Sequence, residues 1–155
     1  MKNYLANFTI VSICETWART KDEFSEFLSS HKCFSCFKKR ASNTGRYYGG
    51  ISVYVSFEIS KFIHRLEPPS KDVIFLRIQK EAFNSANDIV LGCVYLAPEG
   101  SNTYRDNETN GIAILENHIL DLFSKHSNFD LILLGDFNAR TGHLLDYSEE
   151  NTEEN

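Results

Sequence analysis

The chain has 155 residues, of which 42% are hydrophobic and 24% charged, an ordinary composition for one globular domain with a real core. It contains no run of about 18 apolar residues, and its first residues lack an apolar stretch with a cleavage site, so we expect no membrane span, no signal peptide and an intracellular location, with the nucleus as one candidate compartment. The net charge of −5 argues against a uniformly basic surface.

Charge is unevenly distributed along the chain. The last ten residues hold five acids and no base, so we divide the chain into a domain over 1–142 and an acidic, frayed tail over 143–155. No acid occurs from 27 to 57, and this window contains the one basic patch. The candidate contacts to a nucleic-acid backbone are Lys38, Lys39, Arg40 and Arg46. A solvated loop is an equally good interpretation of the patch.

The hydrophobic pattern predicts a chain in which strands dominate. In order it predicts a strand at 8–14, a helix at 20–30, a short strand at 33–37, a loop at 38–50, strands at 51–57, 73–79 and 88–98 with a hairpin turn at 84–87, a loop at 98–108, a helix at 111–126 and a strand at 129–139. The order indicates a mixed α/β domain and not an alternating βαβ array.

The helix at 20–30 is predicted from its apolar spacing. Phe24, Phe27 and Leu28 would share one helical face, and Asp22 and Glu23 would lie in the first turn, where acids are favourable.

The chain has four cysteines, Cys14, Cys33, Cys36 and Cys93. The "CFSC" segment looks like half a zinc site, but no second pair accompanies it. We therefore expect buried free thiols in a reducing compartment.

Three of the predicted strands end in polar side chains. Glu15 follows the first, Tyr95 lies near the end of another, and Asp136 and Asn138 close the last. If these ends meet, two carboxylates, an amide and a phenol would form a site of hard oxygen donors, which suits Mg²⁺ or Mn²⁺ together with a substrate phosphate. Taken singly, each residue has an ordinary alternative, because an acid after a strand is often a turn former or a helix cap.

Four ordered segments resemble one protein family. "LLGDFNARTG", "IVSICETW", "GRYYGGISVYV" and "GCVYLAP" are similar to motifs of the endonuclease/exonuclease/phosphatase superfamily, over about residues 8 to 142. The sequences of the first two segments are most similar to those in the endonuclease domain of LINE-type (non-LTR) retrotransposons.

The resemblance implies a partial four-layer α/β sandwich of the DNase I-like type, with mixed sheets, that hydrolyses phosphodiesters with Mg²⁺ or Mn²⁺. It implies that Glu15 ligates the metal, that Asp136 positions or activates the attacking water, that Asn138 holds Asp136 and the phosphate, and that Tyr95 hydrogen-bonds the scissile phosphate. It implies DNA, contacted through its phosphate backbone, as the partner.

Two motifs of the family are absent from these 155 residues. No strand ending in Asn-Gly precedes "FTIVSIC", and no Ser-Asp-His occurs. We therefore expect a truncated copy with impaired or no activity, because a phosphate-stabilising group is missing. Two alternatives stay open, namely a non-catalytic retroelement remnant that binds nucleic acid or protein, and a hydrolase of lipid or nucleotide phosphates.

Overall fold

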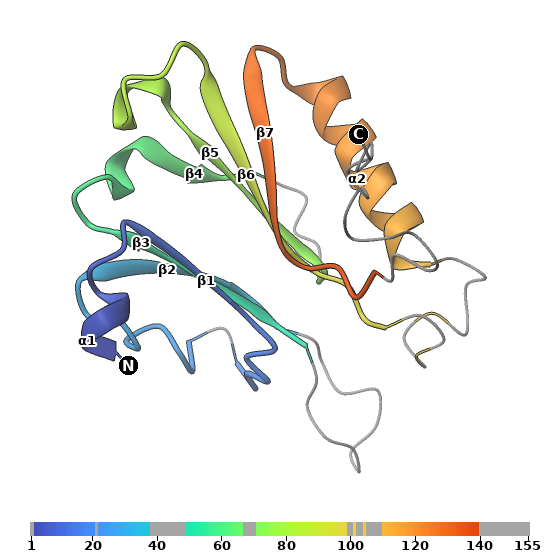
Figure 1. Cartoon of the computed structure of the whole chain (residues 1–155), viewed down its shortest axis with the longest axis horizontal. Helices are drawn as coiled ribbons and strands as arrows, with labels where there is room; N and C mark the ends of the chain where they lie inside the picture. The colour runs from blue at the N-terminus through green and yellow to red at the C-terminus, as the bar shows by residue number, and fades with distance from the viewer. Residues whose placement is uncertain are drawn as a thin grey trace, which may run out of the picture.

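The computed structural model describes residues 2–20, 22–37, 49–66, 71–98, 101, 104 and 110–139. Its elements, in chain order, are α1 (Lys2–Leu5), β1 (Ile10–Cys14), β2 (His31–Cys36), β3 (Ile51–Ser56), η1 (Ser60–Phe62), β4 (Ile63–Arg65), β5 (Val73–Ile78), η2 (Lys80–Ala82), β6 (Asp88–Tyr95), α2 (Gly111–Lys125) and β7 (Phe129–Asp136). Figure 1 shows two sheets facing each other, with α2 on the outer side of one of them.

The strands form one antiparallel and one mixed sheet. The three-stranded sheet has the order β1-β3-β2 and is antiparallel throughout. The four-stranded sheet has the order β4-β5-β6-β7, and only its β6–β7 pair is parallel. The connection between those two parallel strands carries α2, as a parallel pair requires. The predicted mixed α/β class is confirmed.

Two apolar clusters hold the layers together. The first lies between the sheets and combines β3 residues such as Val53 with β5 and β6 residues such as Leu76 and Cys93. The second lies on the other face of the four-stranded sheet, where Leu115 and Leu122 of α2 pack on that sheet. Both faces of β5 and β6 are therefore covered, which explains their almost uninterrupted apolar sequences.

The predicted helix at 20–30 is wrong. Residues 22–30 form successive turns, with backbone bonds such as Ser25 N–H to Asp22 O at 3.1 Å and Phe27 N–H to Phe24 O at 3.1 Å. The Ser25 hydroxyl also donates to Asp22 O at 2.8 Å, and such local bonds compete with helix formation.

The apolar residues of that segment are nevertheless packed as a layer. Leu28 is buried, and the ring of Phe27 lies 5.7 Å from the ring of Tyr54, whose hydroxyl donates to Phe24 O at 2.9 Å. These turns cover the outer face of the three-stranded sheet. Among the described residues, α2 is thus the one helical layer of the expected four-layer sandwich.

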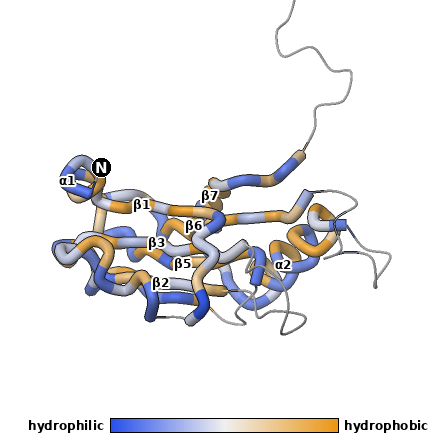
Figure 2. The backbone as a smooth tube through the Cα atoms, turned by 90° about the horizontal axis from the view of Figure 1, so that it is seen from below, coloured by the Kyte–Doolittle hydropathy of each residue, from blue (hydrophilic) through white to orange (hydrophobic). Residues whose placement is uncertain are grey.

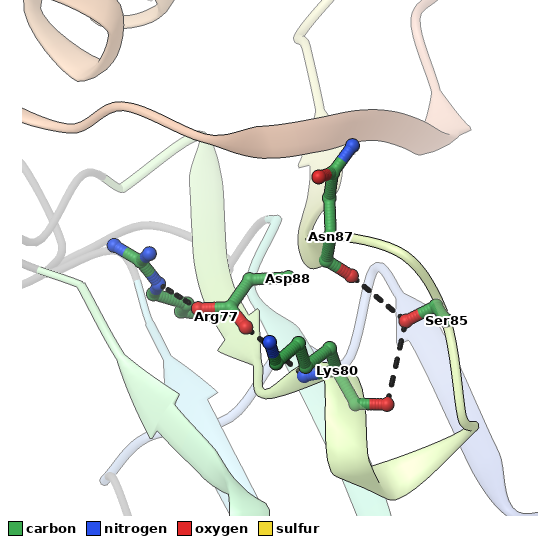
Figure 3. Close-up of polar contacts among 5 residues, drawn as sticks. All are labelled: Arg77, Lys80, Ser85, Asn87 and Asp88. Atoms are coloured by element: carbon green, nitrogen blue, oxygen red, sulfur yellow. Dashed lines mark hydrogen bonds and ion pairs between the residues drawn. The ribbon is translucent and has the colours of Figure 1, made fainter.

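The β5–β6 hairpin closes with a polar network at the end of the sheet away from Tyr95. Asp88 pairs with Arg77 at 2.7 Å and accepts the backbone N–H of Lys80 at 3.0 Å (Figure 3). The Ser85 hydroxyl donates to Asn87 O at 2.8 Å, and Asn84 has a left-handed φ of 51°. The predicted hairpin turn at 84–87 is confirmed, with η2 added before it.

The other predicted strands and the helix at 111–126 are confirmed within a few residues. The short elements α1 and β4 were not predicted. The four cysteines form no disulfide; Cys36 and Cys93 are buried, and Cys14 and Cys33 are half-buried. Within the described ranges, no helix is long and apolar enough to cross a membrane.

Candidate active site

The ends of β1, β6 and β7 meet at one edge of the molecule. In the parallel β6–β7 pair, the last register partners are Tyr95 and Asp136. The Cys14 thiol, at the end of β1, donates to Val94 O at 3.4 Å and so joins the two sheets there. Figure 2 shows β1 and β7, each an edge strand of its sheet, on the same side of the molecule. The side chains that follow these strands therefore share one edge.

A short hydrogen bond at this edge links Tyr95 to Glu15. The phenol donates to Glu15 Oε1 at 2.5 Å. Tyr95 is only 5% exposed, whereas Glu15 faces solvent. Burial raises the pKa of Tyr95 first, and its hydrogen bond to Glu15 and the negative charges of Glu15 and Asp136 raise this pKa further. The phenol is therefore a neutral proton donor, held within the field of two carboxylates.

Glu15 directly follows β1 and has an unusual backbone conformation. Its φ of 53° is left-handed, a conformation uncommon for a residue with a side chain. The segment is held to the loop before β3 by two backbone bonds, from Thr16 N–H to Gly50 O at 3.3 Å and from Trp17 N–H to Gly49 O at 2.9 Å. Glu15 is thus held by its neighbours in a strained, left-handed backbone conformation at the end of a strand. Strain of this kind clusters at functional sites.

Gly135 determines how β7 ends. Its φ is +138°, and a Cβ atom there would lie 1.9 Å from Val94 O. Only glycine allows β7 to approach β6 this closely. The next residue, Asp136, then pairs with the end of β6, because Leu96 N–H donates to Asp136 O at 2.9 Å.

Asp136 and Asn138 form a tight turn beyond the strand. Asp136 Oδ1 accepts the backbone N–H of Asn138 at 2.9 Å, and Asn138 has a left-handed φ of 45°. The Asn138 side-chain amide donates to Leu96 O at 2.8 Å. Asp136 is thus a turn former, as its ordinary interpretation predicts, and Asn138 ties the loop after β7 to the loop after β6. Both roles leave Asp136 exposed at the shared edge.

A cavity of about 200 Å³ lies beside Asn138. It is bordered by the segments that follow β6 and β7 and by the start of α2. Its lining residues are Leu96, Ala97, Tyr104, Asn110, Gly111, Ile112, Phe137, Asn138 and Ala139. Tyr104 could not be singled out from the sequence; it is 9% exposed and accepts the N–H of Ala97 at 2.9 Å. Asn110 caps α2 by accepting Ala113 N–H at 2.8 Å.

The donor chemistry of this edge fits a hard divalent cation. Glu15 and Asp136 are exposed carboxylates, and each uses one oxygen in a hydrogen bond. Within the described part of the chain, no group of three or more His, Cys, Asp or Glu side chains could hold a metal. The mode that fits is the one common for Mg²⁺, with one or two carboxylates, several waters and a substrate phosphate.

The predicted nucleic-acid contacts Lys38, Lys39, Arg40 and Arg46 lie outside the described residues, as does the predicted tail at 143–155.

Comparisons with known proteins agree on the fold family. The sequence profile described as the Endonuclease/Exonuclease/phosphatase family matches residues 1–148. The structure is similar to that of TDP2 from C. elegans, with a TM-score of 0.54, 12% identity and coverage of 96% of this chain and 43% of that one. A truncated Caenorhabditis elegans TDP2 gives a TM-score of 0.52, 14% identity and coverage of 94% and 56%. The chain therefore spans about half the length of these structures. No curated protein sequence matches it.

Proposed function

Because the chain belongs to the endonuclease/exonuclease/phosphatase family, we propose that the edge carrying Glu15, Tyr95 and Asp136 is a metal-dependent phosphodiester hydrolase site. The observation that carries the proposal is the 2.5 Å hydrogen bond from the Tyr95 phenol to Glu15, on a tyrosine that is the register partner of Asp136. It ties the three side chains, which come from three strand ends, to one small region.

Glu15 is the proposed metal ligand, with Mg²⁺ or Mn²⁺ as the ion. Glu15 is exposed and its Oε1 accepts the Tyr95 hydrogen bond, so its second carboxylate oxygen, Oε2, is the proposed contact to the cation. When bound, such an ion would polarise a phosphoryl oxygen and stabilise the charge that develops on it.

Asp136 is the proposed group that positions and deprotonates the attacking water. Its Oδ1 accepts the backbone N–H of Asn138, which fixes the orientation of the carboxylate. The other oxygen, Oδ2, is then the acceptor for a water proton. Asn138 would hold this carboxylate through its backbone and contact the phosphate through the second proton of its side-chain amide, because the first is bonded to Leu96 O.

Tyr95 is the proposed hydrogen-bond donor to the scissile phosphate. A phenol has one proton to donate, and here Glu15 receives it. A bound phosphate would therefore have to take this hydrogen bond from Glu15. The raised pKa of Tyr95 favours this role, since the phenol stays protonated at neutral pH.

We propose that these 155 residues alone turn over poorly. The segment contains no Ser-Asp-His, and a missing group that stabilises the transition state commonly costs about 10²-fold or more in rate. The residues of the Glu-Thr-Trp and GDFNARTG motifs are most similar to those of LINE-type endonucleases. We therefore propose DNA as the substrate. A hydrolase of lipid or nucleotide phosphates and a non-catalytic binding remnant are the competing assignments.

A Mn²⁺ titration tests the metal assignment directly. We expect weak binding by the wild-type chain, because few protein ligands are supplied, and weaker binding by Glu15→Gln. Glu58→Gln is the matched control, since Glu58 is also exposed but follows β3 at the opposite end of the same sheet. Equal binding by wild type and Glu15→Gln would remove Glu15 from the metal site.

A further inference from the structure

Trp17 stands out beside the proposed site as a large aromatic residue in an unusual setting. It is the only tryptophan in the chain, and 49% of it is exposed. Its φ of 53° is left-handed, which is rare for a bulky residue. Backbone strain of this kind clusters at functional sites, so the exposed indole is a candidate binding residue.

The backbone around Trp17 is fixed from several directions. Trp17 N–H is bonded to Gly49 O, and the preceding Thr16 is seated against Gly50, where an added Cβ would lie 2.5 Å from Thr16 Oγ1. The following residue, Ala18, is buried. These contacts hold the backbone of Trp17 in its left-handed conformation.

Trp17 is also close to the proposed metal ligand. It is two residues from Glu15, so their Cα atoms are at most about 7 Å apart. Every nucleotide on either side of a cleaved phosphodiester carries a base with an aromatic face. Stacking on an aromatic side chain is tolerant of sequence and strong for its size, and it suits a rigid, half-exposed ring.

We infer that Trp17 is a stacking platform for a nucleobase next to the scissile phosphate. The inference rests on the proposed function and adds a binding contact that no carboxylate provides. The ligand class is therefore an unpaired or locally unstacked nucleotide of a nucleic acid.

The single tryptophan makes the inference directly testable by intrinsic fluorescence. A short single-stranded DNA oligonucleotide would be titrated into the chain, with Ca²⁺ in place of Mg²⁺, beside an abasic oligonucleotide of equal length and charge. We expect saturable quenching of Trp17 by the first and little by the second. Equal quenching by both, or none while binding is seen by anisotropy of a labelled oligonucleotide, would overturn the inference.

Variants separate stacking from general binding. Trp17→Ala should weaken binding of the base-containing oligonucleotide about 5-fold or more and leave the abasic one unchanged, and Trp17→Phe should restore most of the loss. Phe57→Ala is the matched control, because Phe57 is an exposed aromatic residue just beyond the opposite end of β3. If Trp17→Ala binds like wild type, only this inference fails. If no version binds either oligonucleotide, the proposed action on DNA fails with it.

Discussion

The Tyr95 phenol and the Glu15 carboxylate lie 2.5 Å apart although 80 residues separate them in the chain. Glu15 follows β1 of the three-stranded sheet, and Tyr95 ends β6 of the four-stranded sheet. The contact therefore bridges the two sheets at the edge where we place the site, and it should matter for stability as well as for chemistry.

Replacing Tyr95 by Phe tests this bridge. The change keeps the buried ring and removes one hydrogen bond to a carboxylate. We expect a loss of about 1 kcal/mol in the free energy of unfolding, which is small for a hydrogen bond to a charged group because Glu15 faces water. Urea unfolding measures it. Tyr4→Phe is the control, since Tyr4 is largely exposed on α1. Equal unfolding midpoints for both variants would show that the bridge contributes nothing.

Alkaline pH should destabilise the protein through its buried phenols. Burial raises the pKa of Tyr54 from 10.0 to about 12, so its proton is released more easily in the unfolded chain. The stability from this group is complete below pH 10 and falls as pH rises toward 12. Urea midpoints measured across that range should fall less steeply in Tyr54→Phe than in wild type. Equal slopes for Tyr54→Phe and wild type would show that ionisation of Tyr54 does not cause the loss of stability.

Gly135 should tolerate no side chain. In Gly135→Ala the Cβ would meet Val94 O, and the φ of +138° would be strained, so we expect a loss of about 3 kcal/mol or failure to fold. Gly92→Ala on the neighbouring strand is the comparison, because its Cβ would meet side-chain atoms, Leu133 Cδ2 at 2.5 Å and Phe75 Cε1 at 2.9 Å, whereas the Cβ at position 135 would meet backbone. A cost for Gly135→Ala no larger than that for Gly92→Ala in urea unfolding would show the end of β7 to be more adaptable than described.

The Asp88–Arg77 pair should make the hairpin sensitive to acid. The hydrogen bond from Arg77 is the main cause that lowers the pKa of Asp88 from 3.8. The stability that the ionised Asp88 carboxylate contributes is therefore present above pH 3.8 and is lost as pH falls through its lowered pKa in the folded protein. Because both side chains are partly exposed, Asp88→Asn should cost only about 0.5–1 kcal/mol at pH 7, and less at pH 3. A cost independent of pH would show that the charge of Asp88 is not what matters.

The strands could be predicted because their sequences record burial on one or both faces. Residues 51–57 and 88–98 are apolar and β-branched, and both became strands covered on two sides. The turns at 22–30 were not predictable from apolar spacing alone, since Phe27 and Leu28 pack on the sheet equally well from turns. Strand β4 has three residues, too few for a periodic signal.

The residues of the candidate site could be predicted from the sequence, but their contacts could not. The sequence singled out Glu15, Tyr95, Asp136 and Asn138, because each ends or follows a strand. It could not show that Tyr95 is bonded to Glu15, since that contact depends on how two sheets face each other. The left-handed backbone conformations of Trp17 and Asn138 were not predictable either, because contacts with distant parts of the chain hold them.

Plasmid nicking with Mg²⁺, at enzyme excess, is the most direct test that this edge hydrolyses phosphodiesters. The wild-type chain would be compared with Asp136→Ala and with Asp130→Ala, a control on the same strand β7 but toward its other end. We predict slow nicking, about 10²-fold or more below a family enzyme that contains the Ser-Asp-His motif, that is kept in Asp130→Ala and lost in Asp136→Ala. Equal nicking by wild type and Asp136→Ala, or none by wild type under these conditions, would contradict the account.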